Sequence, residues 1–120
     1  MELKRKEIQP GIVVIEMTGR ILMGPDCQRI EQELEQLLRQ NQTRVIFDVS
    51  EVSTIDSAGV GKIVRCYSQL KKAGGVLRLA GVKGMLEGAF RITQVNKVIG
   101  MYPTTAEAAA SFPSASEAKG

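Results

Sequence analysis

The sequence predicts an α/β fold: a mixed, mostly parallel sheet of four to five strands, with about four helices mainly on one face. Short runs rich in β-branched residues alternate with longer segments in which apolar residues recur every three to four positions. The elements read β-β-α-β-α-β-α-β-α, and strands that alternate with helices are typical of parallel βαβ units. The chain has 120 residues, about the length of one domain.

The first two strands should form a hairpin. The predicted strand at residues 3–8 is short and highly charged, which suits an exposed edge of the sheet. A Pro-Gly turn separates it from the apolar, β-branched strand 12–18. Because so few residues connect the two strands, they should pair antiparallel.

The central strand lies between two crossover helices. A loop at 19–24 leads to a helix over 25–40, which begins with proline and has one apolar face. Residues 44–49, RVIFDV, are typical of a buried strand. A polar loop at 50–56 then leads to a second helix, Ser57–Lys72, which a glycine pair ends.

The last elements are shorter. A strand at Val76–Ala80 is followed by a third helix at 84–93 and a short strand at 98–102. A threonine and a glutamate at capping-box spacing introduce a final helix over 105–112. Residues 113–120 are small and polar, and we predict that they form a disordered tail.

The strands place apolar side chains mainly on one face of the sheet. In the central strand, Val45, Phe47 and Val49 should face one side, while Arg44 and Asp48 face the other. One apolar face and one mixed face are expected when helices cover mainly one side.

Composition excludes several kinds of active site. The chain has no histidine, which rules out Ser–His–Asp and Cys–His nucleophiles, His-ligated zinc and histidine acid–base catalysis. Carboxylates at convincing paired spacing are also missing, so an enzyme is the weakest interpretation, and no cofactor or metal is expected. A net charge of +3, with two tyrosines and three phenylalanines, gives little support to direct nucleic-acid binding.

The cysteines and the apolar runs predict a cytoplasmic protein without membrane insertion. Cys27 and Cys66 form no CxxC pair, and both fall at apolar positions of the expected helices, so we interpret them as buried, reduced thiols. The first residues contain no apolar signal region, and the longest apolar run, 12–15, is too short to span a bilayer.

The most informative segment leads from the central strand into the second helix. Gly59 and Gly61 lie in the first turn, where a bare backbone allows close approach by another chain or a ligand. Ser57 should stand at the helix N-terminus, where free N–H groups tolerate a phosphate. Asp56 could cap the helix or repel that phosphate. From local physics alone, a serine that only caps the helix is the simpler interpretation of Ser57.

Three sharper interpretations of this segment are not supported. The run GVGK is followed by Ile63 rather than Ser or Thr, which rules out a P-loop. Val64 stands where a dinucleotide fingerprint needs its third glycine. Asp48, Glu51 and Asp56 could suggest a Mg²⁺ site, but solvated loop acids and a helix cap are favoured.

The pattern V-x-x-I-D-S-x-G-V-G follows the central strand. Its members are Val52, Ile55, Asp56, Ser57, Gly59, Val60 and Gly61. This pattern resembles the signature of STAS domains, in particular that of the bacterial anti-sigma factor antagonists. The resemblance extends over residues 3–112 and implies a single STAS-like domain at 1–112.

The resemblance implies a phosphorylation switch. In the family, the serine that matches Ser57 is phosphorylated by an anti-sigma factor that is itself a serine kinase, and a phosphatase reverses the modification. The unphosphorylated antagonist binds the anti-sigma factor and frees the sigma factor. The implied partner-binding residues are Asp56, Ser57, Gly59, Gly61 and, as weaker candidates, Ser53 and Thr54.

The chain departs from the family pattern after its second strand. Many members carry Gly-Glu-Leu-Asp there, whereas this chain has Gly-Arg-Ile-Leu and lacks the acidic pair. Because this loop should lie near the phosphorylation segment, Arg20, together with Leu22 and Met23 as exposed residues, could change which partner is recognised.

Other functions stay open. The chain could be a non-switching STAS subunit of a membrane transporter or signalling complex. It could also bind a nucleotide or small anion at the helix N-terminus. The charged first strand could pair two copies into a weak homodimer.

Overall fold

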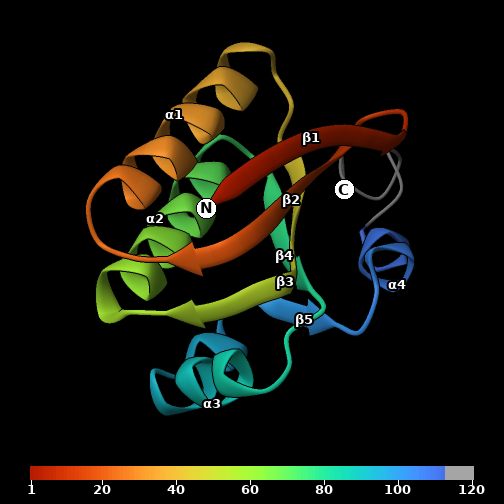
Figure 1. The fold of residues 1–120 in the computed structure, drawn as a ribbon. Coiled ribbons are helices and arrows are strands. Elements are labelled where there is room, and N and C mark those ends of the chain that lie inside the picture. The colour runs from red at the N-terminus through yellow and green to blue at the C-terminus, as the bar shows by residue number, and fades with distance from the viewer. Residues whose placement is uncertain (113–120) are drawn as a thin grey trace.

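The strands of the computed structural model, which describes residues 1–112, form one sheet in the order β1-β2-β3-β4-β5 (Figure 1). They are β1 (Glu2–Gln9), β2 (Ile12–Ile21), β3 (Arg44–Ile55), β4 (Val76–Ala80) and β5 (Gly100–Tyr102). The edge strand β1 pairs antiparallel with β2, and the other neighbouring pairs are parallel. The predicted hairpin and the mixed, mostly parallel sheet are confirmed.

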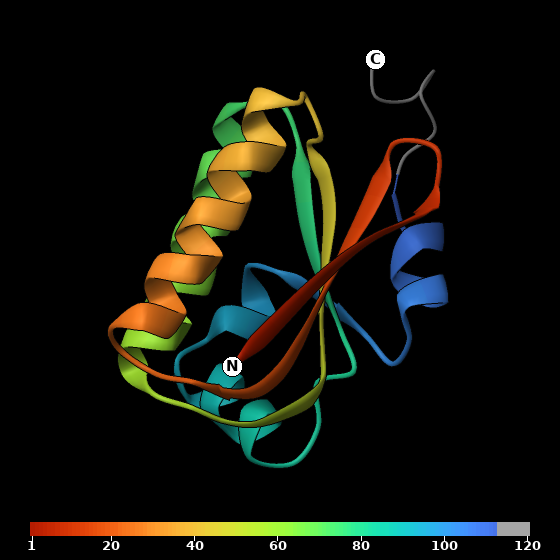
Figure 2. The ribbon, with the colours of Figure 1, turned by 45° about the horizontal axis from the view of Figure 1, so that its top comes forward.

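The helices lie mainly on one face of this sheet, as predicted. They are α1 (Pro25–Arg39), α2 (Ser57–Lys72), α3 (Met85–Ile92) and α4 (Thr105–Ala110), with a 3-10 turn, η1 (Val95–Lys97), before β5. Figure 2 shows α1 and α2 on one side of the sheet and α4 on the other. The larger core joins α1, α2 and α3 to the sheet and contains the fully buried Phe90. A smaller core packs Ala108 and Phe112 against Ile46 on the opposite face.

Strands β2 and β3 are longer than predicted. They end at Ile21 and Ile55 rather than at 18 and 49, so most of the two expected loops is strand. The extensions bury Ile21, Val52 and Ile55, and two register shifts in the β2–β3 pairing accommodate them. Burial of these apolar side chains therefore outweighs the loop preference of the polar residues between them.

Smaller differences concern the last third of the chain. β5 begins at Gly100 rather than at 98, because the backbone N–H groups of Val98 and Ile99 donate to the carbonyl oxygen of Val95 in η1 instead of pairing with β4. The capping threonine before α4 is confirmed: Thr104 Oγ1 accepts a hydrogen bond from the Glu107 backbone N–H at 3.1 Å. α4 ends at Ala110, two residues earlier than predicted. The expected tail, 113–120, lies outside the described residues.

Cys27 and Cys66 are buried free thiols, as predicted. Burial raises the pKa of both thiols, to about 12 for Cys66. Because the thiolate is the reactive form, we expect both cysteines of the folded protein to react very slowly with an aromatic disulfide reagent at neutral pH, and both to react at once in urea. Absorbance of the released thiolate measures the two phases. One full equivalent released promptly by the folded protein would contradict this expectation.

Candidate functional site

The candidate site lies where the ends of β2 and β3 meet the start of α2 (Figure 1). Ile21 of β2 pairs with Ile55 of β3, and the backbone N–H of Asp56 then donates to the carbonyl oxygen of Ile21 at 3.2 Å. The two strands therefore stay side by side up to the first turn of α2. The loop after β2 is adjacent to this turn, as the sequence indicated.

Asp56 connects the loop after β2 to α2. It is the N-cap of α2, with an extended backbone, and its Oδ1 accepts a hydrogen bond from the Gly59 backbone N–H at 2.8 Å. Its Oδ2 accepts from the backbone N–H of Met23, in the loop after β2, also at 2.8 Å. These bonds, that of Met23 first and that of Gly59 second, lower the pKa of Asp56. Asp56, and not Ser57, is thus the residue that caps the helix.

Asp56→Asn should lower stability at neutral pH and have little effect in acid. Asparagine caps helices about as well as aspartate, but its single oxygen replaces two acceptors, so the bond to Gly59 or to Met23 is lost. Because folding lowers the pKa of Asp56, its stabilisation is complete above the unfolded value of about 3.9 and disappears as the pH falls through the folded value. Urea unfolding of both proteins across this range tests the prediction, which a pH-independent difference would contradict.

Ser57 is the first residue of α2 and is exposed. The first turn of this helix contains no acidic residue, and its N-terminus favours negative charge. Both carboxylate oxygens of the neighbouring Asp56 already accept hydrogen bonds from backbone N–H groups. A phosphate on Ser57 would therefore be compatible with the fold while adding about −1.5 to −2 charges to the surface.

Gly59 and Gly61 differ in their surroundings. A Cβ on Gly59 would lie 2.7 Å from the carbonyl oxygen of Ile21 and 2.7 Å from Cγ1 of Ile55. The close approach that Gly59 allows is therefore internal, since it lets α2 begin directly on the ends of β2 and β3. Gly61 is exposed, and a Cβ there would meet nothing within 4 Å. Of the two glycines, Gly61 is the one with open space beside it.

Three further candidates lie along the paired ends of β2 and β3. Ser53 is exposed, and its Oγ donates to the carbonyl oxygen of Gly19 at 3.3 Å. Thr54 pairs in register with the exposed Arg20. The Thr54 hydroxyl donates to Sδ of Met85 at 3.1 Å. The structure thus brings these candidates to the same end of the sheet as the start of α2.

Leu22 differs from the sequence-based expectation. It is half-buried. Its backbone N–H donates to Asp26 at 3.1 Å, and its carbonyl oxygen accepts from the Cys27 thiol at 3.4 Å. The next residue, Met23, is 75% exposed, as expected. Met85 is 64% exposed and was not identified from the sequence, because only the packing of α3 against β3 brings it to this end of the sheet.

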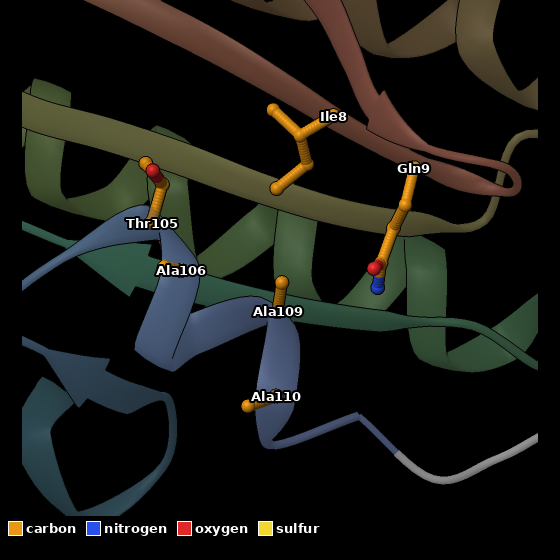
Figure 3. A pocket seen from close by; sticks show the side chains of 6 residues that line it. All are labelled: Ile8, Gln9, Thr105, Ala106, Ala109 and Ala110. Atoms are coloured by element: carbon orange, nitrogen blue, oxygen red, sulfur yellow. The ribbon is translucent and has the colours of Figure 1, made fainter.

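The face of the sheet that α4 covers, opposite to α1 and α2, carries a shallow hollow of about 400 Å³ between the end of β1 and α4 (Figure 3). Its lining residues are Ile8, Gln9, Thr105, Ala106, Ala109 and Ala110. None of these side chains is ionisable, so the hollow offers no general acid or base. Within residues 1–112, no group of three or more acidic, histidine or cysteine residues could hold a metal ion. Nor does any helix in that range have the length and apolarity to cross a membrane.

Comparisons with known proteins agree with the resemblance in the sequence. The STAS domain family model matches residues 4–108. A candidate anti-sigma factor antagonist of Thermotoga neapolitana is 26% identical over 74 residues, which are 62% of this chain and 66% of that protein. The match therefore spans slightly less than two thirds of the relative's length.

Solved structures share the fold. The anti-sigma factor antagonist SpoIIAA, a Bacillus cell fate determinant, is 20% identical and gives TM-scores of 0.70 in its unphosphorylated form and 0.72 in its phosphorylated form. These matches cover 91% of this chain and 94% and 97% of SpoIIAA. A sulfate transporter family protein from Wolinella succinogenes is 22% identical, with a TM-score of 0.76 over 88% of this chain and 87% of that protein. At these identities the matches show the fold alone.

Proposed function

The chain belongs to the STAS domain family, and from this premise we propose that it is an anti-sigma factor antagonist that switches partners by phosphorylation of Ser57. Its unphosphorylated form binds an anti-sigma factor that is also a serine kinase, and thereby regulates transcription that depends on a sigma factor. The kinase transfers phosphate to Ser57 and the complex dissociates. A serine phosphatase then restores the binding form.

The position of Ser57 is the observation that carries this proposal. Its hydroxyl belongs to an exposed residue at the first position of α2, where a kinase can reach it. The neighbouring residue, Asp56, holds the first turn and the loop after β2 together through two hydrogen bonds at 2.8 Å. The phosphoacceptor therefore sits on a well-defined surface that a partner can cover.

A phosphate on this surface would oppose binding through its charge. The uncharged hydroxyl of Ser57 can be covered at little cost. A phosphate would have to lose its water when a partner covers it, and a buried charge without a matching partner group is strongly unfavourable. The surface would thus change from one that accepts the anti-sigma factor to one that excludes it.

Phosphorylation in vitro tests the proposal. The purified chain is incubated with ATP and the anti-sigma factor kinase of its own organism, and the site is mapped by peptide mass spectrometry. We expect one phosphate on Ser57 and none on Ser57→Ala. Ser68, exposed on the same helix, provides the matched control, because Ser68→Ala should be phosphorylated like the wild type. Efficient phosphorylation of Ser57→Ala would refute the assignment.

A non-switching STAS subunit of a larger complex is the second candidate. It is supported by the exposed Arg20 at the paired ends of β2 and β3, because many related antagonists carry an acidic residue at this point. Such a subunit should stay bound to its partner whether or not Ser57 carries a charge. Partner binding by Ser57→Asp therefore distinguishes the two functions.

A further inference from the structure

Two exposed methionines contact the segment that leads into Ser57. Met23 is 75% exposed and Met85 is 64% exposed, whereas Met17, inside the core, is 1% exposed. Met23 belongs to the loop after β2, and Met85 is the first residue of α3. Exposed apolar side chains that cluster on a surface are typical of binding sites, and methionine adapts well to different partners.

Hydrogen bonds hold both methionines beside the end of β3. The backbone N–H of Met23 donates to Asp56 at 2.8 Å, and the hydroxyl of Thr54 donates to Sδ of Met85 at 3.1 Å. Thr54 and Asp56 are two residues apart, so both methionines lie close to the residues that lead into the helix. The bond of Met23 uses its main chain and leaves its thioether in solvent, while the sulfur of Met85 already accepts a hydrogen bond.

We propose that oxidation of Met23 and Met85 by a hydroperoxide is a second modification that blocks partner binding, independently of Ser57. The inference rests on the proposed function, because the partner concerned is the same anti-sigma factor. The two thioethers would form apolar contacts with the partner next to the segment that leads into Ser57. Oxidation would make both of them polar without altering the hydroxyl of Ser57.

The chemistry needs only the methionine and hydrogen peroxide. A lone pair of the sulfur attacks one peroxide oxygen, an S–O bond forms, and the O–O bond breaks. The hydroxide that leaves takes up the proton of the transferred oxygen and becomes water. The sulfur loses two electrons, the peroxide gains them, and the product is methionine sulfoxide. Its polar oxygen would oppose burial wherever the partner offers no donor.

Oxidation rates test the first half of the inference. The protein is exposed to hydrogen peroxide, samples are quenched with catalase, and each methionine is followed by peptide mass spectrometry. We expect Met23 to oxidise faster than Met85, and Met17 to oxidise only in unfolded protein. Thr54→Val removes the hydrogen bond to the Met85 sulfur and should accelerate oxidation at that position. Equal rates for Met17 and Met23 in the folded protein, or no effect of Thr54→Val, would overturn the assignment.

Binding to the untreated anti-sigma factor tests the second half. Oxidised wild type should bind about tenfold or more weakly. The double variant Met23→Leu, Met85→Leu keeps apolar side chains and should bind equally well before and after the same exposure. Unchanged binding by oxidised wild type, or equal loss in the double variant, would overturn the inference. If unoxidised wild type does not bind, the proposed function fails and the blocking role fails with it, whereas the oxidation rates are measured without any partner.

Discussion

Ser57→Asp should weaken binding to the anti-sigma factor about 100-fold, which corresponds to about 2.8 kcal/mol. The wild-type residue is exposed at the first position of α2, so a partner can cover its neutral hydroxyl. A carboxylate in its place carries a charge that loses water on binding, and a buried charge without a counter-charge is costly. Isothermal titration calorimetry of the anti-sigma factor with the unphosphorylated wild type and with Ser57→Asp measures the change in affinity.

Two matched variants separate this effect from a general change in charge or folding. Ser57→Ala should bind the anti-sigma factor like the wild type. Because it lacks the phosphoacceptor hydroxyl, its binding should not weaken when ATP is added. Ser68→Asp places the same charge on an exposed position of the same helix, eleven residues and about 16 Å further along, and should bind like the wild type. Equal weakening by the two aspartate variants would contradict the role assigned to Ser57.

Gly59→Ala should lower the free energy of unfolding by about 2–3 kcal/mol, near the upper end of the usual cost of overpacking. The added Cβ would lie 2.7 Å from the carbonyl oxygen of Ile21 and 2.7 Å from Cγ1 of Ile55. The carbonyl cannot easily move, because it accepts a hydrogen bond from Asp56 at the end of a paired strand. Urea unfolding followed by circular dichroism measures the difference.

Gly61→Ala is the control for this prediction. It makes the same substitution two residues later in the same helix, where a Cβ would meet nothing within 4 Å. Alanine is the better helix former, so stability should stay the same or rise by up to about 1 kcal/mol. Similar destabilisation by both substitutions would contradict the assignment of the Gly59→Ala effect to contact with Ile21 and Ile55.

The sequence predicted the elements whose signal is local. The apolar face of α1, the charged edge strand β1 and the threonine cap of α4 each follow from the spacing of neighbouring residues, and each is confirmed. The end of β2, residues 19–21, and the second half of β3 were missed. In β3 the reason is that Ser50, Ser53 and Thr54 favour loops. These residues form a strand because β3 pairs with β2 here and because Val52 and Ile55 pack into the larger core.

The candidate site was predictable to a similar extent. Asp56 stands directly before a helix, so its capping role follows from known preferences. Its second bond joins it to Met23, 33 residues earlier in the chain, and no local pattern indicates such a contact. The same holds for Gly59, because its need to be glycine comes from the neighbouring Ile21, which the chain brings close only when it folds.

The two hydrogen bonds of Asp56 also affect the conformational entropy that the protein would lose on binding a partner. Because they fix the loop after β2 to the first turn of α2 in the free protein, little conformational entropy is left to lose on association. Complexes with such preorganised surfaces form with small backbone movements. The proposed partner surface around Ser57 would therefore bind in the shape it has in the free protein, and a phosphate on Ser57 would act by repulsion rather than by refolding the loop.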